Sequence, residues 1–337
     1  MTSLATLRRP APALRPADVR LVPVGSPAEW DGLVADHGGV FFHRHAFLST
    51  LAAGLGLALD LRAVEIRGER VGAVPIVSKR LGPLRTVNWL PFPYIGPLVA
   101  PGALPATLAA LVRCEARMRC LRSQHVLLAR HPGPHPGYVA SEDRTFVVPV
   151  AGRTDDELLQ AMNSARRSSI RRAGRQGLRL RAATETEVTR LLPELLAPTF
   201  EQQGLPSPYP SSVMRTVWDR LGGHPDVLMQ AAELDGATVA VQISLAGSAT
   251  ALGWVVGRIP GNEGSDAFAT MILHTLGWVR DRGSTGYDLV GAPTEGIAAY
   301  KRSLGAEERH YTVLRRRSRT HRTAVSLLNH LPGHHLD

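Results

Sequence analysis

A run of arginines in the middle of the sequence could hold a phosphate group. Residues 162–177 read MNSARRSSIRRAGRQG, with Arg167, Arg171 and Arg175 at intervals of four residues, so they form one stripe along a predicted helix. Such a stripe can follow an RNA backbone or bind the diphosphate of a substrate, and a solvated helix face gives the same pattern. Seven arginines within sixteen residues, Arg166 the first of them, favour a binding role.

A second candidate phosphate site follows a predicted strand. In residues 254–265, WVVGRIPGNEGS, Arg258, Gly261 and Gly264 form the pattern R-x-x-G-x-x-G just before a helix predicted over 265–283. Backbone N–H groups at a helix N-terminus can bind phosphate. Glycine-rich loops before helices are common, so this pattern alone identifies no ligand.

Asp288 lies in the segment YDLVG, near the end of a strand predicted over 287–290. A carboxylate in this place can bind an amine or accept its proton. It can equally cap the helix that begins near Glu295, and the sequence favours the cap slightly. Glu295 is a weaker candidate for the same chemistry. With only Cys114 and Cys120, and histidines without ligand spacing, we expect no metal site.

Two hairpins of the same kind predict an internal repeat. Residues 63–77 read AVEIRGERVGAVPIV and residues 231–245 read AAELDGATVAVQISL; each is a strand, a turn with a charged residue and glycine, and a second strand. Predicted helices surround both hairpins, over 27–37, 46–55 and 104–123 in the first half and over 154–176, 185–203, 211–221 and 265–283 in the second. We therefore expect one α/β unit twice, over residues 18–150 and 151–311, after a disordered tail over 1–17.

The chain is strongly basic, with 39 lysines and arginines against 29 acidic residues in 337, a net charge of +10. This balance favours a polyanionic partner such as RNA, a nucleotide-bearing substrate or an anionic membrane surface. Lys79 and Lys301 are the only lysines. This bias toward arginine explains which basic residue is used, but not why basic residues outnumber acidic ones. No run approaches the ~20 apolar residues of a membrane span, and the start lacks the apolar region of a secretory signal. We expect a soluble, cytoplasmic protein without integral membrane association.

Four motifs in order resemble one family. Besides the basic run at 162–177 and the hairpin at 231–245, residues 287–305 read YDLVGAPTEGIAAYKRSLG, similar to the pattern YD-x-x-G…G-I…(F/Y)-K-x-x-(F/L)-G, and VFFHRHAFLSTL and VGAVPIV…PFPYIGPLV occur in the first half. Together they resemble the Fem-type (FemXAB, BioF2-like) branch of the GNAT acyltransferase superfamily. The resemblance covers most of residues 35–315.

The resemblance implies an α/β (α+β) fold of two tandem GNAT-like domains, with mixed central sheets and a cleft between them. Residues 312–337 would return to complete the first domain. It also implies transfer of an acyl or aminoacyl group onto an amine. Some members take the group from charged tRNA and others are regarded as dependent on acyl-CoA, whose pyrophosphate loop is one residue shorter than the pattern at Arg258.

The resemblance also assigns roles to single residues. Lys301, in the motif Y-K-x-x-L-G, would stabilise the oxyanion that forms when an amine attacks an ester or thioester; otherwise it is a solvated helix residue. Tyr300 would shape the acyl pocket, and Tyr94, Tyr209 and Trp254 would belong to the acyl or acceptor pocket, with core packing as their alternative role.

We therefore expect an amide-forming transferase that moves an aminoacyl group from aminoacyl-tRNA to a small amine acceptor, in cell-wall or secondary-metabolite synthesis. It would need no cofactor or metal, would bind tRNA, and would be a monomer or weak homodimer. Two alternatives stay open: an acyl-CoA-dependent N-acyltransferase on the same fold, and a non-catalytic RNA-binding protein.

Overall fold

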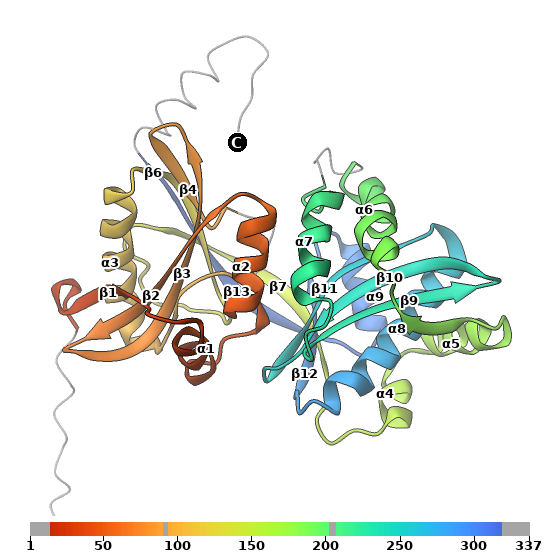
Figure 1. The fold of residues 1–337 in the computed structure, drawn as a ribbon. Coiled ribbons are helices and arrows are strands. Elements are labelled where there is room, and N and C mark those ends of the chain that lie inside the picture. The colour runs from red at the N-terminus through yellow and green to blue at the C-terminus, as the bar shows by residue number, and fades with distance from the viewer. Residues whose placement is uncertain (1–13, 90–93, 202–206, 319–337) are drawn as a thin grey trace, which may run out of the picture.

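The computed structural model describes residues 14–89, 94–201 and 207–318. Most of the tail predicted over 1–17, and most of the segment 312–337, lie outside the described residues. The elements from β1 to β6 occupy one side of the molecule, and those from α4 to α9 occupy the other, while β7 and β13 cross between the two sides (Figure 1).

The elements of the N-terminal half are η1 (Pro16–Asp18), β1 (Val19–Pro23), α1 (Pro27–Asp36), η2 (Phe41–His43), α2 (His45–Gly54), β2 (Ala58–Ile66), β3 (Glu69–Leu81), β4 (Leu84–Val87), β5 (Leu98–Val99), η3 (Pro101–Ala103), α3 (Leu104–Arg117), β6 (Cys120–Leu127) and β7 (Val139–Pro149). Those of the C-terminal half are α4 (Asp155–Ala161), α5 (Ser164–Arg175), β8 (Arg179–Ala182), the π-helical turn η4 (Glu187–Leu191), α6 (Leu192–Glu201), α7 (Ser211–Leu221), β9 (Val227–Leu234), β10 (Ala237–Leu245), β11 (Thr250–Arg258), α8 (Gly261–Arg280), β12 (Gly286–Gly291), α9 (Glu295–Ser303) and β13 (Glu307–Arg317).

Both halves follow one order of elements. A first strand is followed by two helices, three antiparallel strands, a helix and a strand that pairs in parallel with the third one, β4 with β6 and β11 with β12. The predicted hairpins are confirmed. The turn residues Arg67 and Gly68, and likewise Asp235 and Gly236, all have positive φ, as a two-residue hairpin turn of right-handed twist requires.

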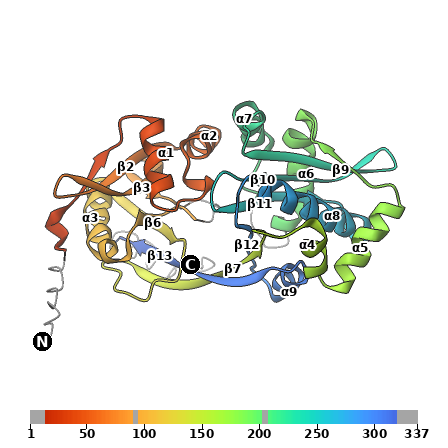
Figure 2. The same ribbon diagram turned by 90° about the horizontal axis from the view of Figure 1, so that it is seen from below.

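The described strands form one sheet in the order β1-β2-β3-β4-β6-β13-β7-β12-β11-β10-β9-β8, with β5 beside β3. The last strand of each half is therefore exchanged. β7, which follows β6 in the chain, pairs with β12, and β13, which follows β12, pairs with β6. The two exchanged strands also pair with each other and run beneath both halves (Figure 2).

Two predicted boundaries in the C-terminal half are wrong. The helix predicted over 154–176 is two helices, α4 and α5, because Asn163 leaves helical geometry and its side chain accepts a hydrogen bond from the backbone N–H of Arg166 (2.9 Å), an N-cap. The helix predicted to begin at residue 265 begins at Gly261. Gly264 therefore lies in the first turn of α8 rather than in the loop before it.

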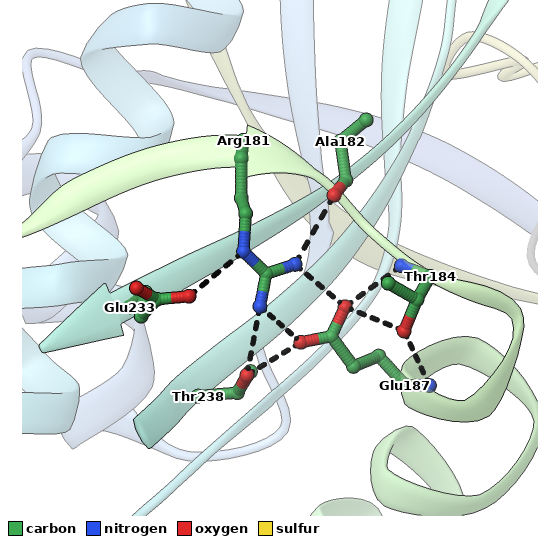
Figure 3. Close-up of polar contacts among 6 residues, drawn as sticks. All are labelled: Arg181, Ala182, Thr184, Glu187, Glu233 and Thr238. Atoms are coloured by element: carbon green, nitrogen blue, oxygen red, sulfur yellow. Dashed lines mark hydrogen bonds and ion pairs between the residues drawn. The ribbon is translucent and has the colours of Figure 1, made fainter. Parts of the chain in front are cut away.

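A partly buried ion pair joins β8, the first strand of the C-terminal half, to its neighbours (Figure 3). The Arg181 guanidinium donates to both carboxylate oxygens of Glu187 (2.7 and 2.8 Å) and to Glu233 on β9 (2.9 Å). Glu187 also accepts from the backbone N–H and hydroxyl of Thr184 and from the hydroxyl of Thr238. Burial opposes ionisation of Glu187, but these donors outweigh it and lower its pKa to about 2.

One apolar core is shared by the two halves. It includes Phe41, Phe47 and other side chains of the first half together with Val213, Val217 and other side chains of α7. The Phe47 ring meets the Trp254 ring edge-on, with centroids 5.0 Å apart. Because large apolar side chains from both halves exclude water together, we expect the halves to stay packed as one unit.

Candidate functional site

A cavity of about 430 Å³ lies where the halves meet. Its wall comes from the turn between α1 and α2, from Tyr94, from Thr145 on β7, from the β10–β11 turn, from Asp288 on β12 and from residues 309–311 on β13. Both exchanged strands therefore contribute to it. The volume is that of a small-molecule site.

Asp288 is the buried carboxylate of this cavity, with 5% of its surface exposed. It accepts hydrogen bonds from the Tyr94 hydroxyl (3.0 Å), the Thr145 hydroxyl (2.5 Å) and the backbone N–H of Val290 (2.6 Å). Burial raises the pKa of Asp288, and the three donors and the nearby charge of Lys301 oppose that rise. The carboxylate is thus held in one orientation by both halves, in a place where an amine could reach it.

Lys301 reaches the end of β12 from α9. Its ammonium donates to three consecutive carbonyls, those of Leu289 (2.5 Å), Val290 (2.9 Å) and Gly291 (2.6 Å). The pairing of β12 with β7 is irregular between Asp288 and Gly291, and Val290 has a φ of +66°, which is unusual for a β-branched residue. Lys301 binds the carbonyl of Leu289 and Asp288 binds the N–H of Val290, which are the two ends of one peptide unit. Together they hold the strained backbone at Val290.

The geometry gives Lys301 a role beyond the one predicted from the resemblance. An ammonium has three N–H donors, and here all three are engaged, while Lys301 itself does not line the cavity. Burial lowers the pKa of Lys301 to about 8, although the Asp288 carboxylate opposes this. Its part in oxyanion stabilisation stays a prediction, and that role requires a substrate oxygen to replace one carbonyl.

Tyr94 lies in the cavity wall, among the aromatic residues predicted to form a pocket. It has a φ of +69°, and its ring meets that of Tyr311 edge-on with centroids 5.3 Å apart. Burial and the charge of Asp288 raise the pKa of Tyr94 well above its ordinary value, so its hydroxyl stays a donor.

Tyr209 and Trp254 lie in the shared core and not among the residues that line the cavity. The Trp254 indole N–H donates to the Tyr209 hydroxyl (3.3 Å), and burial raises the pKa of Tyr209 to about 12. Their predicted pocket role stays a prediction, and their contacts show them packing the two halves together.

Tyr300 joins a second cluster, at the start of α8. Its ring stacks on Phe268 with centroids 5.7 Å apart, and the Arg166 guanidinium lies 4.9 Å from its centre. Arg166 also donates to the Ser265 hydroxyl (3.2 Å). The predicted acyl-pocket residue and one predicted phosphate-binding arginine are therefore neighbours here.

The other predicted phosphate ligands lie on α5 and at the end of β11. Arg167 binds backbone carbonyls at the end of α4, including that of Gln160 (3.2 Å), whereas Arg171 and Arg175 are exposed. Arg258, at the end of β11, makes a weak contact with the carbonyl of Ile259 (3.4 Å). Arg167, Arg171 and Arg175 all lie on α5, and the phosphate-binding role predicted for them and for Arg258 stays a prediction.

The glycines of the predicted phosphate loop are required by the backbone conformation and by close packing of the backbone. Gly261 has a φ of +88°. A Cβ on Gly264 would overlap the carbonyl oxygen of Ile259, so only glycine fits there.

After Leu252, β11 separates from β12, with which it pairs only from Thr250 to Leu252. Among the described strands, this edge of β11 has no further partner on that side.

Thr145 and Tyr311 were missed by the sequence reasoning. Both belong to long exchanged strands, and they reach the cavity only because β7 and β13 cross to the other half. A local motif carries no signal for such a long-range pairing.

Residues 161–302 match the family model of the acetyltransferase (GNAT) domain. The crystal structure of FemX is similar with a TM-score of 0.67 at 16% identity, over 86% of this chain and 96% of that one. The chain has the FemX fold. The predicted resemblance to the Fem-type branch and the predicted tandem GNAT-like fold are confirmed at the level of structure.

Other proteins share this Fem-type fold. A tandem GNAT protein from the clavulanic acid biosynthesis pathway has a TM-score of 0.55 at 15% identity, over 89% of this chain and 98% of that one. L-PGS from Bacillus licheniformis has a TM-score of 0.52 at 11% identity, over 93% and 99%. The search of curated proteins found no match. Within the described ranges, no helix has the length and apolar character needed to cross a membrane.

Proposed function

We propose that the chain is an amide-forming acyltransferase that moves an aminoacyl group from aminoacyl-tRNA, in the cytoplasm, to the amine of a small acceptor. The observation that carries this proposal is Asp288, a buried carboxylate in the wall of a cavity built from both halves. The Fem-type fold and the GNAT domain support acyl transfer, and the basic charge of the chain supports a tRNA donor.

The acceptor amine occupies the cavity beside Asp288. Attack of the amine nitrogen on the ester carbonyl forms the new C–N bond and a tetrahedral oxyanion. The Asp288 carboxylate accepts the proton that the nitrogen loses. Collapse of the intermediate breaks the C–O bond to the ribose, and the proton passes to the departing oxygen, so atoms and charge balance.

The surrounding residues determine the orientation and the basicity of the Asp288 carboxylate. Tyr94 and Thr145 fix its orientation, and burial raises its pKa and so makes it a stronger base than an exposed aspartate. Lys301 acts as a positioning residue for the end of β12 and supplies a positive charge near the developing oxyanion.

A transfer assay tests the proposal. Purified protein is given a labelled pool of charged tRNA or labelled acyl-CoAs, with a panel of small amines and with or without RNase. We expect RNase-sensitive transfer from charged tRNA, reduced by about 10²–10⁴-fold in Asp288→Asn. Asp156→Asn, which neutralises an exposed carboxylate on α4, is the matched control. Full activity of Asp288→Asn would contradict the assigned role.

A second candidate function is acyl-CoA-dependent N-acyl transfer. The specific observation that favours it is the free edge of β11 beyond Leu252, which leads to the N-terminus of α8 beside Arg258. An extended ligand can pair with such an edge, and its phosphates would then meet the first N–H groups of the helix. Transfer that depends on acyl-CoA and is unaffected by RNase would establish this alternative.

A further inference from the structure

A basic groove lies in the N-terminal half, apart from the cavity between the halves. It has a volume of about 1090 Å³ and is lined by β1, the first part of β2, the tip of the β3–β4 hairpin and the C-terminal part of α3. Among the described residues that line it, seven are arginines and Asp60 is the only carboxylate. α3 lies on the side of this half that faces away from the C-terminal half (Figures 1 and 2).

Most arginines of the basic groove have no acidic partner among the described residues. Arg80 and Arg85 are direct partners across β3 and β4, and like charges in this position repel. Arg113 and Arg117 are four residues apart on α3, again an unfavourable pairing. Among the described residues these four arginines form no ion pair, and of the seven only two do, Arg62 with Asp60 at 2.7 Å and Arg20 with Glu65 at 3.9 Å.

This arrangement costs stability unless an anion lies between the guanidinium groups. The arginine fork matches the oxygens of a phosphate and can bind two of them at once. The surface is concave, whereas a flat bilayer needs a flat or convex surface to bind to. The groove has a volume of about 1090 Å³, at the upper end of small-molecule pockets, roughly 1,000 Å³, so it has room for more than one phosphate group.

The lining also indicates the form of the polyanion. Proteins that bind single strands stack the bases on aromatic side chains, and none of the described residues that line the basic groove is aromatic. A double-helical RNA stem keeps its bases inside and presents phosphates and 2′-hydroxyls, so it is recognised by shape and backbone contacts.

We propose that the basic groove binds the phosphate backbone of a double-helical RNA stem. Resting on the proposed function, the stem belongs to the tRNA that delivers the aminoacyl group. This assigns tRNA docking mainly to the N-terminal half and not to the arginines of α5, of which Arg166 and Arg172 are held by contacts with α8.

A triple variant, Arg80→Gln, Arg117→Gln and Arg119→Gln, tests the groove. All three side chains line it, are exposed, and make no side-chain hydrogen bond within the described part of the chain, so the fold should tolerate their loss. The matched control removes the same charge elsewhere, by Arg67→Gln, Arg179→Gln and Arg190→Gln, also exposed. Binding of labelled, uncharged tRNA and of a labelled RNA duplex is measured across a salt series, with thermal unfolding as a check on folding.

We expect the groove variant to bind both RNAs more weakly and its slope of log affinity against log salt to fall by about 3, one for each phosphate that is no longer neutralised by an arginine. The affinity of the control should fall clearly less. An equal fall in both variants, or an unchanged slope in the groove variant, overturns the proposal. Stronger binding of the wild type to phosphatidylglycerol vesicles than to RNA, abolished in the groove variant, would assign the groove to a membrane and overturn it as well.

The outcome separates this proposal from the proposed function. Uncharged tRNA reports docking without chemistry, and the transfer assay reports chemistry. Transfer from charged tRNA by a groove variant that keeps its RNA affinity refutes the groove alone. Absence of transfer from any charged tRNA, with groove-dependent RNA binding intact, refutes the transferase function while the groove stands.

Discussion

Replacement of Lys301 by methionine tests whether a buried ammonium holds the end of β12. The wild-type side chain donates to three backbone carbonyls, and burial lowers its pKa from 10.5 to about 8. In the unfolded chain the lysine keeps its ordinary pKa. Between the two values the unfolded state binds more protons than the folded state, so the free energy of unfolding rises with pH.

The size of this effect follows from the pKa difference. Burial of the charge costs the folded state about 3 kcal/mol below the folded pKa, and this cost disappears as the pH rises toward the unfolded pKa. Most of the change falls between about pH 7 and pH 10, where the wild type should gain roughly 2 kcal/mol relative to Lys301→Met. Methionine has no charge to lose, so the difference isolates the ammonium from the titration of buried tyrosines.

Urea unfolding followed by tryptophan fluorescence measures the difference at both pH values. Lys79→Met removes the only other lysine, which is exposed on β3, and should show the wild-type pH dependence. A constant difference between the wild type and Lys301→Met from neutral to alkaline pH would show that the ammonium is not desolvated. The argument that it supports Val290 would then be wrong.

Three further changes test other parts of the structure. Tyr94→Phe removes a donor to Asp288, so kcat/KM should fall about tenfold at neutral pH and its acidic limb should move to higher pH, as a pH–rate profile will show. Glu187→Gln should lower the free energy of unfolding by about 2 kcal/mol at neutral pH; because the pKa of Glu187 is lowered to about 2 from 4.5, the deficit should shrink as the pH falls through that window in urea titrations. Gly264→Ala should lower the thermal midpoint by the equivalent of about 1–3 kcal/mol, because its Cβ would meet the backbone oxygen of Ile259; an unchanged midpoint would contradict the geometry of the α8 start.

The hairpins and the repeat could be predicted because their signals are local. A charged residue followed by glycine, between two alternating runs, fixes a two-residue turn at Arg67–Gly68 and again at Asp235–Gly236. Helix boundaries were less secure where one side chain decides them. Asn163 divides the predicted helix into an acidic first part and a basic second part, which it caps. Polar residues on both sides of Asn163 continue a helical pattern, so the break is not visible in the sequence.

The candidate site was only partly predictable. Asp288 and Tyr94 stand in recognisable segments, so the sequence could propose them. Thr145 enters the site because β7 leaves its own half to pair with β12. No local sequence pattern near Thr145 predicts that exchange. The three carbonyl partners of Lys301 belong to backbone whose conformation at Val290 is itself set by the tertiary contacts.

The strand exchange explains why the chemistry needs both copies of the repeat. Asp288 belongs to the C-terminal half, but the hydroxyls that orient it come from Tyr94 and from β7, both of which precede that half in the chain. One aromatic neighbour of Tyr94 is Tyr311 on β13, the strand that closes the sheet of the N-terminal half. Neither copy alone can assemble this set. The carboxylate is therefore oriented only when both exchanged strands are in place, which couples completion of the fold to formation of the site.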